Sequence, residues 1–82
     1  MKLLVKHYFK KKGERGYKKQ SSSVVKDSTI DDYLVFFPTG VKKRNPDNIV
    51  KTKYVDYGTT YKRIIKNKRT GNSTMLVLKE FY

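Results

Sequence analysis

Lysine and arginine occur in clusters along this chain, and several of them alternate with tyrosine. Tyr8 is separated by one residue from Lys6 and from Lys10, so an extended strand would place these three side chains on one side. Ammonium groups spaced along a surface can hold successive phosphates, and a tyrosine ring between them can stack a nucleobase. These residue types at this spacing predict contact with nucleic acid.

Several parts of the chain supply candidate contacts. They are the segments around Tyr8 and Tyr17, a short basic run at residues 42–44, the tyrosine–lysine alternation that ends at Tyr57, and the basic segment 62–69. A small core without tryptophan also needs tyrosine for packing, so each tyrosine has two candidate roles. The full predicted set is Lys6, Tyr8, Lys10, Lys11, Lys12, Arg15, Tyr17, Lys42, Lys43, Arg44, Lys51, Lys53, Tyr57, Lys62, Arg63, Lys66, Lys68 and Arg69.

The sequence offers little that could support catalysis. His7 is the only histidine, and in a strand it would share a face with apolar residues and act in packing rather than as a base. Asp31 and Asp32 are adjacent, so they fit the cap of a turn better than a magnesium site. Serines 21–23 have no base nearby, and the absence of cysteine excludes thiol nucleophiles and cysteine-based metal sites. We expect no enzymatic activity, cofactor or metal.

The overall charge is strongly positive. Lysine and arginine number 20 against 7 acids, which gives a net charge of +13 and a pI near 10.0. Self-repulsion of this size opposes folding and is tolerated best when the partner is a polyanion. Solubility is the alternative reason for the charge, but a magnitude of about 2–8 already keeps a small domain soluble.

The charge is unevenly distributed along the chain. Residues 1–20 carry +7 and residues 61–82 carry +5, whereas residues 41–60 carry +3 and residues 21–40 carry −2. A binding surface is therefore expected to use the first segment and the second half of the chain.

Local preferences favour strands over helices. Alanine is absent, and Val, Ile, Thr, Tyr and Phe are frequent. A flexible loop or arm is predicted near residues 10–23, and a single helical turn capped by Ser28 is predicted at residues 28–33. Strands are predicted at residues 2–10, 23–26, 33–37, 49–57, 61–68 and 73–81.

Three of these segments have distinctive patterns. The apolar run at residues 33–37 is predicted as a strand buried on both faces, which ends at Pro38 and is followed by a turn at Thr39-Gly40. Residues 49–57 fit a strand by alternation and a helix by the spacing of Val50, Tyr54, Tyr57 and Tyr61. Their β-branched residues favour the strand. The segment RTGN predicts a hairpin between the last two strands.

These elements predict one mainly β domain spanning residues 1–82. Five or six short antiparallel strands fit a small barrel, OB-like or SH3-like, or a strongly curved sheet. The first strand would pack Leu3, Val5, His7 and Phe9 on one side and expose a basic opposite side. No RNP, KH, Walker or zinc-finger motif is present.

The expected function is nucleic-acid binding of low sequence specificity. The chain has only four arginines and no evident recognition helix, so few side chains could recognise specific bases. Lysine-rich strands with aromatic residues favour single-stranded DNA or RNA, although a protein that binds duplex by its shape would have a similar composition. Two alternatives remain open: a small phage or mobile-element protein that inhibits an acidic host protein or a ribonucleoprotein complex, and a structural role in ribosome or virion assembly.

Composition also indicates an origin and a location. A chain without alanine and tryptophan but rich in Lys, Tyr, Asn and Ile is typical of an AT-rich genome, as many phages have. No apolar run approaches the roughly 20 residues of a membrane span, and the N-terminal segment is too short and too charged for a signal peptide. We expect a cytoplasmic protein that does not enter a membrane.

Overall fold

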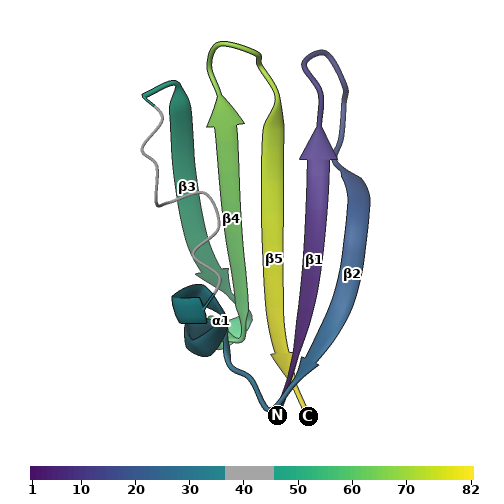
Figure 1. Ribbon diagram of the computed structural model, residues 1–82, viewed down its shortest axis with the longest axis vertical. Coiled ribbons are helices and arrows are strands. Elements are labelled where there is room, and N and C mark those ends of the chain that lie inside the picture. Colours follow the sequence, from purple (N-terminus) through teal and green to yellow (C-terminus); the bar gives the residue numbers. More distant parts are fainter. Residues whose placement is uncertain (37–45) are drawn as a thin grey trace.

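The computed structural model describes residues 1–36 and 46–82, and in that part of the chain five strands form one antiparallel sheet (Figure 1). The sheet order is β2-β1-β5-β4-β3. The predicted mainly β fold is confirmed. The elements are β1 (Lys2–Lys10), β2 (Lys18–Lys26), α1 (Ile30–Phe36), β3 (Asn48–Val55), the 3-10 turn η1 (Asp56–Gly58), β4 (Thr60–Asn67) and β5 (Ser73–Phe81).

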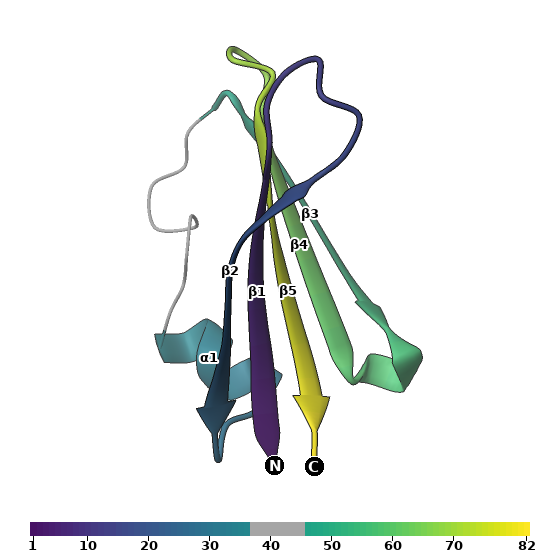
Figure 2. The ribbon, with the colours of Figure 1, turned by 90° about the vertical axis from the view of Figure 1, so that its right-hand side faces the viewer.

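The sheet is open and strongly twisted. Figure 2 shows the strands fanning out along their length, and within the described residues no pairing joins the outer strands β2 and β3. Of the two predicted forms, the curved sheet is the one observed, and it does not close into a barrel. Its outer strands are polar or charged along much of their length, which discourages pairing with other chains.

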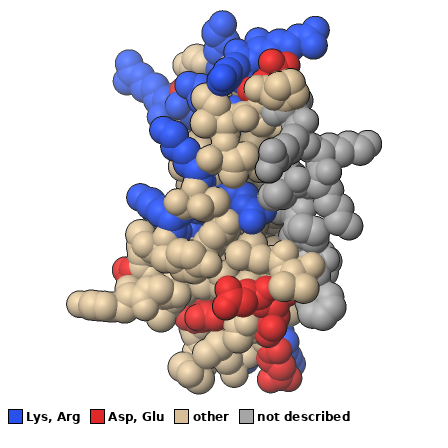
Figure 3. All heavy atoms as spheres, turned by 90° about the vertical axis from the view of Figure 1, so that its left-hand side faces the viewer, with Lys and Arg blue, Asp and Glu red and all other residues tan. Residues whose placement is uncertain are grey.

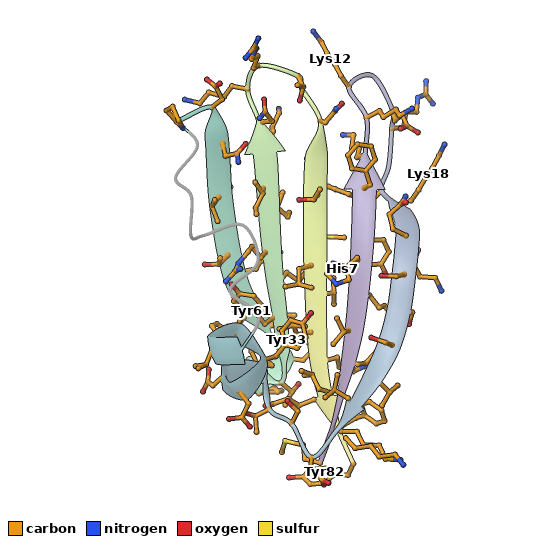
Figure 4. All side chains as sticks on the ribbon, in the orientation of Figure 1. His7, Lys12, Lys18, Tyr33, Tyr61 and Tyr82 are labelled. Atoms are coloured by element: carbon orange, nitrogen blue, oxygen red, sulfur yellow. The ribbon has the colours of Figure 1, made fainter. Side chains whose placement is uncertain are left out.

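The core lies between α1 and the half of the sheet beneath it. Strand register aligns Val5, Leu78 and Tyr61 across β1, β5 and β4, and all three are buried. From α1, Ile30 and Tyr33 pack against this row, and Figure 4 shows Tyr33 and Tyr61 close together where the helix meets the sheet. Burial raises the pKa of the Tyr33 hydroxyl. The predicted packing side of the first strand is confirmed for its first half.

The prediction of a strand at residues 33–37 is wrong. Most of this run belongs to α1, where Ile30 and Tyr33 lie on one side because they are separated by three residues. Val35 is 75% exposed, so the run is not buried on both sides. Packing of one helical face onto the sheet has overridden the strand preference of an apolar, aromatic segment. The predicted turns at Pro38 and Thr39-Gly40 lie outside the described residues.

A reciprocal pair of hydrogen bonds fixes the start of α1. The Asp32 N–H donates to Thr29 Oγ1 at 3.2 Å, and the Thr29 N–H donates to Asp32 Oδ2 at 3.2 Å. This is a capping box with Thr29, rather than the predicted Ser28, as the capping residue. The Ile30 N–H donates to Glu80 Oε2 at 3.0 Å, which joins the first turn to β5.

The capping arrangement predicts different effects at two neighbouring residues. Thr29→Ala should lower the free energy of unfolding by about 1 kcal/mol, because it removes the acceptor of the Asp32 N–H. Ser28→Ala should change it much less, because the Ser28 hydroxyl makes a long hydrogen bond, 3.4 Å, to the Thr29 carbonyl and does not cap the helix. Urea unfolding of both variants checks this, and an equal loss would show that Thr29 is not the cap.

The predicted arm near residues 10–23 is shorter than expected. β2 begins at Lys18, so only residues 11–17 connect β1 to β2. Gln20 is an extra residue where the β1–β2 register shifts between His7 and Tyr8. The serine-rich segment is an exposed edge strand because pairing with β1 satisfies its backbone on one side. Its polar composition had suggested a linker.

The 11–17 loop packs against the β4–β5 loop, residues 68–72. The Lys12 N–H donates to Asn72 Oδ1 at 3.0 Å. Gly71 has a φ of +76°, and a Cβ placed there would lie 2.8 Å from the Lys12 side chain. We call this pair of loops the loop end of the sheet.

Gly71→Ala should therefore destabilise the loop end. A left-handed conformation costs an L-residue roughly 1–2 kcal/mol, and the new methyl group would also displace Lys12. Gly16→Ala is the matched control, because Gly16 lacks a positive φ and nothing lies within 4 Å of its added Cβ. Thermal unfolding should show a lower Tm for Gly71→Ala alone. A Tm equal to that of the parent would contradict the close packing of the loops.

Candidate nucleic-acid interface

The side of the sheet turned away from α1 carries a dense set of lysines. Side chains alternate between the two sides of a strand, so the register that directs Leu3, Val5 and Leu78 toward α1 directs the residues between them to the opposite side. We call this side, on the right of the sheet in Figure 2, the lysine face. Its ten lysines are Lys2, Lys6 and Lys10 of β1, Lys19 and Lys26 of β2, Lys51 and Lys53 of β3, Lys62 and Lys66 of β4, and Lys79 of β5.

Nothing in the described structure neutralises this charge. Glu80 is the only acidic residue within the five strands, and it lies on the helix side. Lys53 lies directly opposite Lys62, and Lys2 lies directly opposite Lys26. Directly opposed like charges destabilise a sheet. The lysine face therefore has a charge density that opposes folding.

The opposed lysines predict that Lys62→Gln should stabilise the fold. Relief of the repulsion from Lys53 should raise the free energy of unfolding by roughly 0.2–1 kcal/mol at low salt. Lys66→Gln is the control, because Lys66 pairs with Ile49. The two variants should converge as salt screens the charges. A loss of stability in Lys62→Gln, measured by urea unfolding, would show that the pair is not repulsive.

Apolar side chains lie between the lysines. Leu4, Tyr8, Ile64, Met75 and Val77 are half-buried members of this face. Tyr8 lies between Lys19 of β2 and Met75 of β5 in register, with Lys6 and Lys10 along its own strand. The face thus presents apolar patches separated by ammonium groups.

The structure brings together seven of the predicted residues, from three strands. They are Lys6, Tyr8, Lys10, Lys51, Lys53, Lys62 and Lys66. The prediction left out Lys2, Lys19, Lys26 and Lys79, which lie on the same face. The two-residue alternation along the first and last strands could have assigned Lys2 and Lys79 to this face. Lys19 could not be assigned from the sequence, because the predicted strand began at residue 23 whereas β2 begins at Lys18.

Six further predicted residues lie in or beside the loop end. Lys11, Lys12, Arg15, Tyr17, Lys68 and Arg69 belong to its two loops. Tyr17 is tied to the sheet, because the Ser73 hydroxyl donates to its oxygen at 2.9 Å and the Lys10 ammonium lies 6.0 Å from its ring centroid. Within this loop Glu14 pairs with Lys18 at 3.0 Å; this bond and the Lys11 N–H hold the pKa of Glu14 below its usual value. Lys42, Lys43 and Arg44 lie outside the described residues.

Arg63 is not on the lysine face. Its side chain is 9% exposed on the helix side, its Nε donates to the Tyr61 hydroxyl at 2.9 Å, and its guanidinium lies 5.5 Å from the Tyr61 ring centroid. Adjacent residues of a strand point to opposite sides, so Lys62 and Arg63 cannot both join one surface. Arg63 therefore supports the core.

Tyr57 does not extend the strand that contains Lys51 and Lys53, as the sequence had suggested. β3 ends at Val55, and Asp56 and Tyr57 adopt left-handed conformations, with φ of 54° and 58°, in the turn to β4. Tyr57 is fully exposed at the end of the sheet opposite to the loop end. It is removed from the candidate interface.

The other tyrosines also leave few rings on the lysine face. Tyr33 and Tyr61 are buried in the core, and Tyr54 stacks edge-on against Tyr61 at 5.2 Å between centroids. Tyr82 is exposed at the C-terminal residue. Tyr8 is therefore the ring best placed for stacking among the strand residues of the face, and Tyr17 of the 11–17 loop lies beside it at Lys10 and Ser73.

Acidic residues gather at the end of the molecule that carries α1. Figure 3, seen from the β3 edge, shows Asp and Glu around the helix at the lower end and Lys and Arg above them and along the left margin. Asp31 and Asp32 in α1 and Asp56 in η1 are exposed there. The lysine face and the loop end form one basic surface, and the acids lie mostly elsewhere.

Comparisons with protein-family models, curated proteins and solved structures returned no match. In the described ranges, no cluster of three or more His, Asp or Glu side chains could hold a metal ion. α1 is also too short to cross a membrane, and the described residues contain no longer helix.

Proposed function

We propose that this protein binds nucleic acid with low sequence specificity, through the lysine face. One observation carries the proposal: ten lysines from all five strands share one uncovered side of the sheet, with two directly opposed pairs and no acid among them. A fold keeps such repulsion most readily when a polyanion relieves it. The basic groups of the loop end add long-range attraction toward the same partner.

The apolar residues of the face favour single strands over duplex. A duplex presents phosphates and groove edges, so Leu4, Ile64 and Val77 would face charged and polar groups that prefer water to apolar contact. Unpaired bases present flat faces that can lie on such residues and on Tyr8, while the lysines hold the phosphates between them. With no recognition helix or arginine fork on the face, base readout has little support.

Fluorescence anisotropy with labelled DNA and RNA oligomers, single-stranded and duplex, tests the proposal. If about five phosphates are neutralised, the slope of log affinity against log salt should be about −3.5 for single strands. Single strands should bind more tightly than duplex of equal length. A flat salt response would contradict the proposal.

The alternative, capture of an acidic host protein or a ribonucleoprotein complex, predicts a different result. After nuclease treatment, stoichiometric retention of one protein together with absent oligomer binding would replace the nucleic-acid proposal with that alternative.

A further inference from the structure

The lysine face is not uniform, because its β3–β4 half contains a hollow. Two adjoining cavities of about 300 and 320 Å³ share Lys51 and Ile64 as lining residues. Thr52, Lys53 and Lys62 complete the first cavity, and Ile49 and Lys66 complete the second. Four lysines therefore surround an isoleucine floor.

The register explains why the hollow has this composition. Ile64 pairs with Lys51, Ile49 pairs with Lys66, and Lys53 pairs with Lys62, so two isoleucines lie diagonally among four lysines. The opposed Lys53–Lys62 pair lies on the lining of the first cavity. An anion at this position would relieve the repulsion between the two ammonium groups.

The chemistry of the hollow is that of a flat apolar group joined to phosphate. The isoleucine floor offers no hydrogen-bonding groups from its side chains, whereas the four lysines around it offer ammonium donors. The volume lies near the lower end of the roughly 300–1,000 Å³ of small-ligand sites, which suits one nucleotide. A base can cover the isoleucines while its phosphate and the next one contact the lysines.

We infer that the hollow seats one unpaired nucleotide of the bound strand, with its base over Ile49 and Ile64 and its phosphates on the four surrounding lysines. The inference rests on the proposed function and deepens it, because it locates where base faces contribute to binding. A base-paired nucleotide does not fit, since its faces are covered by its neighbours in the stack.

A matched pair of exposed residues allows a direct test. Ile49 on β3 is 38% exposed and lines the hollow. Val24 on β2 is 51% exposed and lies on the same face at the opposite edge. Serine at either position removes an apolar contact without changing charge and with little disturbance of the core. Ile64→Ser is the second variant of the hollow, and circular-dichroism melts report whether each variant folds.

The experiment measures anisotropy of a labelled dT oligomer and of a labelled duplex, with thymidine monophosphate as competitor. Ile49→Ser should weaken oligomer binding about fivefold, because part of the apolar area that covers the base is lost, with an unchanged salt slope. Val24→Ser should change oligomer binding less than twofold. Neither substitution should change the affinity for the duplex. Thymidine monophosphate should compete only at far higher concentration than an unlabelled dT oligomer.

The contrary outcomes are distinct from failure of the proposed function. Equal effects of Ile49→Ser and Val24→Ser, or an equal effect of Ile49→Ser on duplex, would overturn the nucleotide seat while leaving nucleic-acid binding intact. Displacement by the mononucleotide at oligomer-like concentrations would overturn it in favour of a free nucleotide. Absence of any oligomer binding by the parent would reject the proposed function itself.

Discussion

Replacing one lysine on each of four strands by glutamine is expected to weaken single-strand binding by roughly several thousandfold at 50 mM salt. Each phosphate contact to a single strand contributes about 0.7 to the slope of log affinity against log salt, or roughly tenfold in affinity between 1 M and 50 mM. Lys6, Lys19, Lys51 and Lys62 are suitable, since all four belong to the lysine face. The slope should become less steep by about 2.8.

The control for this variant changes the same charge at the loop end. Lys11, Lys12, Lys68 and Arg69 lie in its two loops, all exposed, and their replacement by glutamine leaves the lysine face intact. Its effect should be much smaller, because only long-range attraction is lost. An equal loss in the two variants would indicate that binding follows net charge rather than this surface. Unfolding midpoints measured alongside separate lost contacts from lost structure.

Leu78→Ala is expected to have the largest effect on stability. Leu78 is fully buried at the centre of the row that joins Val5 to Tyr61, and α1 covers this part of the sheet. Truncation of a buried leucine costs about 2–5 kcal/mol, and a native domain has only about 5–15 kcal/mol in total. The variant should therefore be largely or partly unfolded at temperatures where the parent is folded.

Val77→Ala provides the comparison, because it is the adjacent residue and points to the other side of the sheet. Val77 is half-buried on the lysine face, and no helix covers it. Its loss should cost appreciably less than that of Leu78, as measured by urea unfolding followed by far-ultraviolet circular dichroism. Similar losses in both variants would contradict the assignment of the core to the helix side.

Much of the strand pattern was predictable because it is local. The first strand was placed at its observed bounds, and the β4–β5 hairpin followed from β-branched segments on either side of a turn sequence. For residues 49–57 the strand alternative was right, although β3 ends at Val55, because the sequence does not reveal the left-handed turn at Asp56 and Tyr57. Asp56, Tyr57 and Gly58 all have positive φ, and they form the turn that closes the β3–β4 hairpin.

The errors share a different physical origin. The serine-rich segment 18–26 has weak local preference for any structure, and it becomes a strand because β1 supplies backbone partners. The run around Tyr33 has strong strand preference, and it becomes a helix because Ile30 and Tyr33 fill the space over Leu3 and Leu78. In both segments tertiary contacts decided the structure.

The sequence by itself determined the net charge, the mainly β class and which residues share a side of the strands that it placed correctly, β1, β4 and β5, because composition and a two-residue repeat are local properties. Only the tertiary structure decided that the basic sides of all five strands join one surface, that Arg63 turns inward, and that isoleucines and lysines form a hollow between β3 and β4. Strand order and register bring together residues that are far apart in the chain. The register of these strands is set by burial of the other side of the sheet, whose apolar residues pack beneath α1.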